Sequence, residues 1–154
     1  MKSRIILAVL SVCLAAAAVC FAADAFSGTW KLNEAKSKAG AGLGKNSTVT
    51  YETMGDSVKV TIEGTTADGK AFKDEWTGKF DGKDYAVTGD ATSDMRSYKR
   101  VDDHTLTFTA TKGGKVTMTG RVVISADGKT RTVTTTITDA SGKKISSSGV
   151  YDKQ

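Results

Sequence analysis

The chain has 154 residues, two cysteines, no proline and a formal net charge of +5 at pH 7. This length allows one domain with a substantial core. The small positive surplus is spread along the chain without a basic block, which argues against a nucleic-acid partner.

Residues 1 to 23 have the layout of a secretory signal peptide: a basic start, an apolar run and then small residues. The apolar run is at the lower limit for a membrane span and lacks a basic flank, which favours cleavage after Ala23 or Ala25. We therefore expect an exported protein, periplasmic or secreted, with a single domain over 24 to 154 that does not span the membrane once processed. Both cysteines lie in the leader, so the mature domain has no disulfide and must be stabilised by packing and strand pairing.

Beyond the leader, apolar alternation with a period of two recurs and predicts strands. Twenty-two threonines and the lack of proline fit the same assignment. The predicted strands lie at 26 to 32, 48 to 54, 57 to 63, 71 to 80, 84 to 88, 95 to 101, 105 to 111, 115 to 124, 130 to 138 and 144 to 151.

Short glycine-containing turns join most of these segments, so that each strand is antiparallel to the next. Examples are Gly55-Asp56, Gly113-Gly114 and the Asp-Gly pair at 127 and 128. The one helical signal is Asn33, which can cap a single turn over 33 to 38.

About ten antiparallel strands must hide their edges, and an up-and-down barrel of eight to ten strands does so by pairing the first strand with the last. Gly28 and Trp30 share one face of the first strand. We expect the glycine to permit close backbone approach and the tryptophan to plug the barrel floor.

The stretch Phe26-Ser27-Gly28-Thr29-Trp30-Lys31-Leu32 resembles the first strand of the calycins, the superfamily of lipocalins, fatty-acid-binding proteins and avidins. The final residues 150 to 154 are similar to the last strand of the fatty-acid-binding branch. The chain most resembles small exported bacterial lipocalin-like proteins. The resemblance implies a calycin-like, all-β barrel that holds a hydrophobic ligand.

The chain also departs from the fatty-acid-binding pattern. The 14 residues from Asn33 to Asn46 are too few for the two lid helices of that branch. Its last strand carries an Arg-x-Tyr pair for the ligand carboxylate, whereas here Tyr151 matches the tyrosine and Gly149 occupies the arginine position.

Strand parity puts several charged side chains on the apolar, inward face: Asp74 with Trp76, Arg131 with its apolar neighbours, and Arg96 with Tyr98. A charge in an apolar interior must pair, reach water or meet a ligand. One interpretation is that Arg131 or Arg96, with a tyrosine, binds an acidic head group; the other is that Asp74 pairs with an arginine and only fixes the barrel. The ligand-binding candidates are Tyr51, Phe72, Asp74, Trp76, Arg96, Tyr98, Phe108, Met118, Arg131 and Tyr151.

Catalysis, metals and cofactors have little support in the sequence. His104 is the single histidine and falls in a predicted turn. Without a second histidine or a mature cysteine, we expect no metal site, no cofactor and no catalytic triad.

We therefore expect a monomeric, non-enzymatic barrel whose partner is a hydrophobic or amphipathic small molecule, such as a lipid or fatty acid. Small inward residues such as Gly78, Gly120 and Gly149 suggest space for it. The alternative is a structural or interaction protein whose barrel is filled by its own side chains and whose surface contacts a protein or cell-surface partner.

Overall fold

The computed structural model describes residues 24 to 154 except 41 and 140; the predicted signal peptide lies outside the described residues. Ten strands and one short 3₁₀ helix make up the described chain. The elements are β1 (Gly28–Leu32), η1 (Glu34–Lys36), β2 (Lys45–Met54), β3 (Ser57–Thr65), β4 (Ala71–Gly78), β5 (Tyr85–Thr88), β6 (Met95–Asp102), β7 (Thr105–Lys112), β8 (Lys115–Ile124), β9 (Thr130–Thr138) and β10 (Lys144–Lys153).

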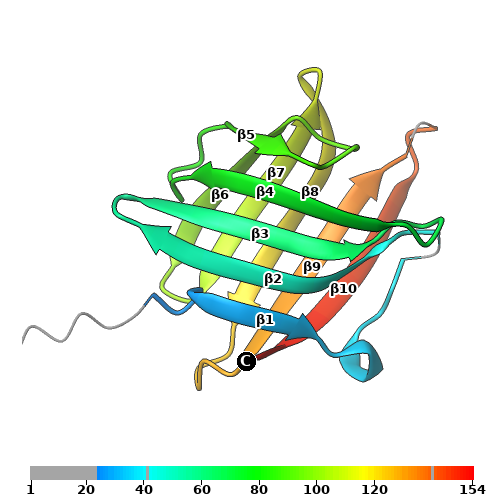
Figure 1. The fold of residues 1–154 in the computed structure, drawn as a ribbon. Coiled ribbons are helices and arrows are strands. Elements are labelled where there is room, and N and C mark those ends of the chain that lie inside the picture. Colours follow the sequence, from blue (N-terminus) through cyan, green and yellow to red (C-terminus); the bar gives the residue numbers. More distant parts are fainter. Residues whose placement is uncertain (1–23, 41, 140) are drawn as a thin grey trace, which may run out of the picture.

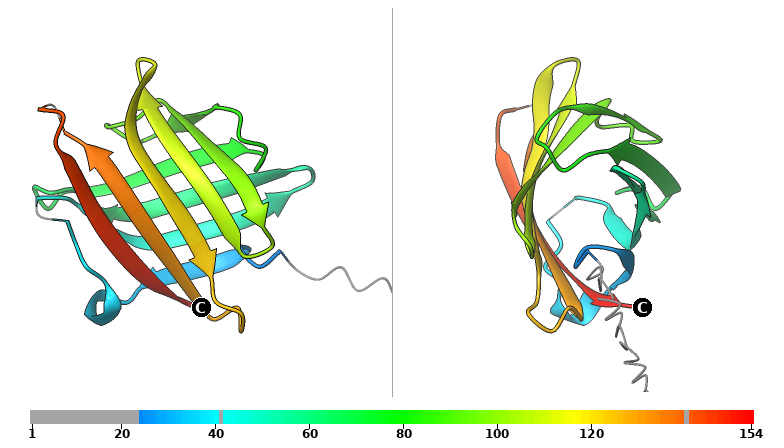
Figure 2. Two further views of the ribbon diagram at one scale, coloured as in Figure 1. Left: turned by 180° about the vertical axis from the view of Figure 1, so that it is seen from behind. Right: turned by 90° about the vertical axis from the view of Figure 1, so that its left-hand side faces the viewer.

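The strands form one closed antiparallel barrel in which every strand pairs with its neighbours in sequence and β1 pairs with both β2 and β10. Figure 1 shows β2, β3 and β4 crossing in front of the strands that follow, and the two views of Figure 2 show β1 to β5 and β6 to β10 curving around a common interior. The all-β, up-and-down prediction is confirmed, and the strand number is ten.

Local signals in the sequence account for the turns. Gly55 adopts a φ of +61° in the β2–β3 turn, a conformation that glycine reaches without steric cost. Asn33 caps η1, with its side chain accepting a hydrogen bond from the Lys36 N–H at 3.2 Å. The predicted helical turn is therefore confirmed.

The expectations for Gly28 and Trp30 hold in part. Trp30 is fully buried, and its indole N–H donates to the Phe26 carbonyl at 2.9 Å. Gly28 is required mainly for its φ of +111°, while the nearest group to its face is the Lys153 side chain rather than a backbone. The glycine therefore sets a backbone bend at the start of β1.

The two ends of the barrel differ in packing. We call the end with Asp24 and the β2–β3, β6–β7 and β8–β9 turns the N-terminal end, and the end with the loop from η1 to β2 the loop end. Toward the N-terminal end, the inward side chains of β8, β9 and β10 are buried. They are Ile124, Arg131 and Tyr151, which pair with one another across the three strands. Inward chains toward the loop end, such as Met118 and Ile137, are only half-buried. On β8 to β10 the tightly packed side chains thus lie at the N-terminal end.

Candidate functional site

The ten predicted ligand-binding residues all lie on inward-facing strand positions. Seven of them are buried: Tyr51, Asp74, Trp76, Arg96, Tyr98, Arg131 and Tyr151. The other three, Phe72, Phe108 and Met118, are half-buried. Strand parity alone therefore identified the interior, but the structure separates these residues into two groups with different chemistry.

The first group surrounds Arg131, the second residue of β9. Its register partner on β10 is Tyr151, whose ring centroid lies 4.7 Å from the guanidinium carbon. One guanidinium nitrogen donates to the Tyr51 hydroxyl at 3.0 Å, and the Tyr51 ring centroid lies 5.5 Å away. Two aromatic faces and one hydroxyl thus hold the cation in place.

No carboxylate accompanies Arg131 in the part of the chain that the structure describes. Its Nε and one Nη are buried and have no hydrogen-bond partner among the described residues. Burial by itself lowers the pKa of Arg131, but Tyr51 and Tyr151 outweigh it and raise the pKa, so the group stays charged. A buried cation with two free donors is suited to an anionic or strongly accepting group.

The second group is an ion-pair cluster around Arg96 on β6. Its guanidinium donates to both carboxylate oxygens of Asp74 on β4, at 3.0 and 3.3 Å, and to Asp90 at 3.0 Å. All three side chains are largely shielded from water, with 5%, 6% and 12% exposure for Asp74, Arg96 and Asp90. The predicted pairing of Asp74 with an arginine is therefore present, and the arginine is Arg96.

Asp90 was absent from the sequence-based candidates because it lies in the loop between β5 and β6. Burial raises the pKa of Asp90, but hydrogen bonds from Ser93 and Thr92 outweigh it and hold the pKa below its ordinary value. Burial also raises the pKa of Asp74, and Arg96 opposes that shift. Because Arg96 already has two carboxylates, it offers no free donor pair comparable to that of Arg131.

Tyr98 lies between these groups in the interior. Burial raises the pKa of Tyr98 to about 12, and its ring packs edge-on to Trp76 at 4.8 Å between centroids. The Trp76 indole N–H donates to the Arg96 carbonyl at 2.7 Å. Trp76 therefore links β4 to β6 through its contact with Tyr98 and its hydrogen bond to Arg96.

The inward glycines do not provide the empty space that the sequence suggested. A Cβ on Gly120 would overlap the Phe108 ring, and one on Gly149 would lie 2.9 Å from the Tyr151 ring. The same holds at Gly78, where the ring of Tyr85 occupies the space at 2.6 Å. These glycines accommodate aromatic rings of the protein itself, because a ring can lie flat over a residue without a side chain.

A hollow of about 540 Å³ lies at the loop-end edge of β2, β3 and β4. Phe72 lies in its lining beside Gly64, Ser47 and Lys73. A register shift between Asn46 and Thr48 lies beside this hollow. Phe72 thus lines the hollow while its strand stays paired with β3.

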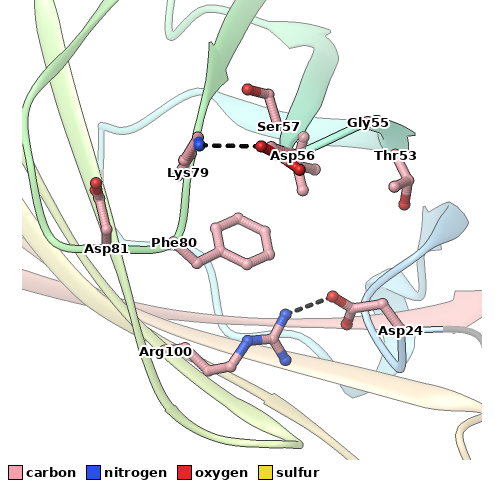
Figure 3. Close-up of a pocket in the computed structure, with 10 residues that line it drawn as sticks. Asp24, Thr53, Gly55, Asp56, Ser57, Lys79, Phe80, Asp81 and Arg100 are labelled. Carbon is pink, nitrogen blue, oxygen red and sulfur yellow. Dashed lines mark hydrogen bonds and ion pairs between the residues drawn. The ribbon is translucent and has the colours of Figure 1, made fainter.

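An open pocket of about 620 Å³ lies at the N-terminal end, and we call it the mouth pocket. Figure 3 shows Phe80 and Arg100 next to each other in its lining, with Asp24 paired to Arg100 and Asp56 paired to Lys79. Sequence reasoning missed Asp24 and Phe80 as site residues. The apolar parity of β4 continues through Phe80 and was a usable signal, whereas nothing local connects Asp24 to Arg100.

The remaining sequence-based expectations concern metals and membranes. His104 is exposed in the β6–β7 turn, as predicted. Over residues 24 to 154, apart from 41 and 140, there is no group of three or more His, Cys, Asp or Glu side chains arranged to hold a metal ion. Within the same residues, no helix has the length and apolar character needed to cross a membrane.

Comparisons with known proteins find a similar fold but no matching family. No protein-family model matches the chain, and no curated protein matches it significantly. Among solved structures, four chains match, including one described as EF1p2_mFAP2b bound to DFHBI. That structure has a TM-score of 0.50 and 11% identity, and the match covers 84% of this chain and 94% of the other. At this identity the similarity concerns the fold alone, which is a closed antiparallel β-barrel.

Proposed function

We propose that the barrel binds a small amphipathic molecule, such as a fatty acid, whose acidic group is held by Arg131. The observation that carries the proposal is the buried Arg131 guanidinium with two nitrogens that lack an acceptor. Burying a cation in this state is unfavourable unless a further acceptor can reach it. A carboxylate could accept a charge-assisted hydrogen bond from either of these nitrogens.

The apolar part of such a molecule would lie against half-buried side chains toward the loop end. Phe108 and Met118 face the interior on β7 and β8 and are less tightly packed than the core. Phe72 on β4 is half-buried as well. The similar barrel bound to DFHBI supports the general proposal that an interior of this kind takes a small molecule.

The proposal includes no catalytic step and no cofactor. We further propose that the chain acts as a monomer outside the cytoplasm, after removal of residues 1 to 23. The composition of those residues supports this part of the proposal.

The alternative, a barrel filled by its own side chains that acts through its surface, is favoured by the rings that occupy the inward glycines. The two proposals differ in one measurable property, the presence of a saturable interior site. A binding experiment with a matched pair of ligands therefore distinguishes them.

The test is a fluorescence titration with N-phenyl-1-naphthylamine, an uncharged apolar probe, followed by displacement with oleate or with oleyl alcohol, which has the same tail and no charge. Arg131→Gln should weaken the displacement by oleate by about ten- to a hundredfold, since a hydrogen bond to a charged group is worth about 1.5–3 kcal/mol. Displacement by oleyl alcohol should change by less than about twofold, because it makes no ion pair with Arg131.

Arg121→Gln is the matched control, because Arg121 is exposed on the outer face of β8. The control should behave like the wild type with both ligands. Equal weakening of oleate and oleyl alcohol by Arg131→Gln would contradict the assigned role of Arg131. Absence of saturable binding by the folded wild type would instead favour the filled barrel.

A further inference from the structure

The chain before β1 forms a short segment, residues 24 to 27, that closes the N-terminal end of the barrel. The Asp24 carboxylate accepts the Phe26 N–H at 3.1 Å, and the Asp24 carbonyl accepts the Ser27 N–H at 2.9 Å. The other carboxylate oxygen of Asp24 pairs with Arg100 on β6. We call residues 24 to 27 the N-terminal segment.

The ring of Phe26 is the part of this segment that enters the barrel. It is only 1% exposed and forms a triangle with the rings of Phe80 and Tyr51, with centroid separations of 6.0, 6.4 and 6.5 Å. The Arg100 guanidinium carbon lies 5.2 Å from the Phe26 ring centroid and 5.3 Å from that of Phe80. Arg100 therefore joins the segment to the wall both by charge and by ring contact.

This aromatic triangle separates two features that bear on ligand binding. On one side is the mouth pocket, whose lining includes Phe80, Arg100 and Asp24. On the other side is Arg131, which donates to the hydroxyl of Tyr51. A single layer of rings thus separates the mouth pocket from the buried cation.

We propose that the N-terminal segment is a latch over the entrance to the interior, and that displacement of Phe26 opens a path from the mouth pocket to Arg131. An amphipathic acid would pass tail first and come to rest with its acidic group at Arg131, close to the entrance. This inference depends on the proposed function for the ligand, but the latch itself can be tested without one.

The hydrogen bonds and the ion pair that hold the N-terminal segment are compatible with its movement. The segment precedes β1 and so lies outside the ladder hydrogen bonds of the barrel. Its ion pair is partly exposed, with 28% exposure for Asp24 and 34% for Arg100, and such pairs contribute little stability. Segments outside the strand ladders open locally more often than the core strands do.

The first test measures hydrogen exchange of the two tryptophan indole N–H groups by NMR, using protein purified from cells that express the full chain. The Trp30 indole donates to the Phe26 carbonyl and reports on the latch, whereas the Trp76 indole donates to the Arg96 carbonyl and is an internal control. Asp24→Asn keeps an oxygen for the Phe26 N–H but removes the charge. It should speed exchange at Trp30 by about two- to fivefold, the effect expected for losing a partly exposed ion pair.

Asp103→Asn is the matched variant, since it makes the same charge change in the exposed β6–β7 turn at the same end of the barrel. It should leave both indoles unchanged. Equal acceleration at Trp30 and Trp76 by Asp24→Asn would indicate global destabilisation and overturn the latch, as would no acceleration at either.

The second test follows the binding of 1-anilinonaphthalene-8-sulfonate by stopped flow. Because a latch controls passage rather than affinity, Asp24→Asn should raise the association and dissociation rate constants together, by about two- to fivefold, and leave their ratio within about twofold. If Asp24→Asn leaves both rate constants unchanged while oleate binding depends on Arg131, the proposal that the ligand enters past the N-terminal segment is overturned. The proposed function is then unaffected. No binding in any variant would overturn both, while Trp30 exchange would still report whether the segment moves.

Discussion

Arg131 and Arg96 are both buried and inward-facing, but we expect methionine at the two positions to affect stability differently. Arg96→Met leaves Asp74 and Asp90 without their cation, and breaking a buried ion pair in this way costs about 3–5 kcal/mol. Arg131→Met loses one hydrogen bond from a charged donor, worth about 1.5–3 kcal/mol, and contacts with two rings, worth about 0.5–2 kcal/mol each.

Arg131→Met also removes two buried nitrogens without acceptors, and each such group costs about 1–3 kcal/mol in the wild type. These gains and losses nearly cancel. The free energy of unfolding of Arg131→Met should therefore lie within about 1 kcal/mol of the wild-type value.

Urea unfolding followed by tryptophan fluorescence measures both effects, since Trp30 and Trp76 are buried in the native barrel. Arg121→Met, on the exposed outer face, is the control for removing a charge. A loss of about 3 kcal/mol or more for Arg131→Met, similar to that for Arg96→Met, would refute the reasoning. It would mean that Arg131 stabilises the barrel without ligand and therefore has a structural role.

Three further predictions concern the entrance, the interior and the wall. A chain that begins at Phe26 instead of Asp24 would place a charged amino group on a buried residue and lose the ion pair with Arg100. Its free energy of unfolding in urea should fall by about 1–2 kcal/mol, and a value equal to that of the chain from Asp24 would contradict this. Burial raises the pKa of Tyr98 to about 12 from 10.0, so the unfolded chain releases this proton first. The free energy of unfolding is therefore intact below pH 10 and falls toward pH 12, by up to about 3 kcal/mol. Tyr98→Phe should reduce this slope in urea titrations across that range, and equal slopes for the variant and the wild type would argue against it. Gly120→Ala should destabilise the barrel by about 1–3 kcal/mol because its methyl group meets the Phe108 ring, and a thermal melt like that of the wild type would show that the ring moves freely.

Much of the architecture could be predicted because its determinants are local. Gly55 and the other turn glycines mark where strands end, and period-two alternation marks which side chains face inward. The position of Asn33 before Lys36 predicted the one helical turn through a side-chain cap. These signals act over a few residues and do not depend on how distant strands meet.

The site was harder to predict because its chemistry depends on partners far apart in the sequence. Strand parity put both Arg96 and Arg131 inside, but only the closed barrel shows that Asp74 and Asp90 both pair with Arg96. The space over Gly149 was also misjudged, since the Tyr151 ring turns back over its own strand to fill it. Small inward residues indicate a cavity only if no neighbouring ring can reach them.

The arrangement of the barrel separates the stable part of the interior from the less packed part. Arg131 lies among the buried core at the N-terminal end, whereas the inward chains near Met118 are half-buried. An anion at Arg131 would thus bind where the low dielectric strengthens a charged hydrogen bond, and its tail would lie where packing is loosest. Binding there would satisfy donors that the empty barrel leaves unpaired, so a ligand at a hundred times its Kd should stabilise the barrel by about 2.7 kcal/mol. Arg131→Met loses that gain while remaining folded, and this is how a binding group differs from a structural one.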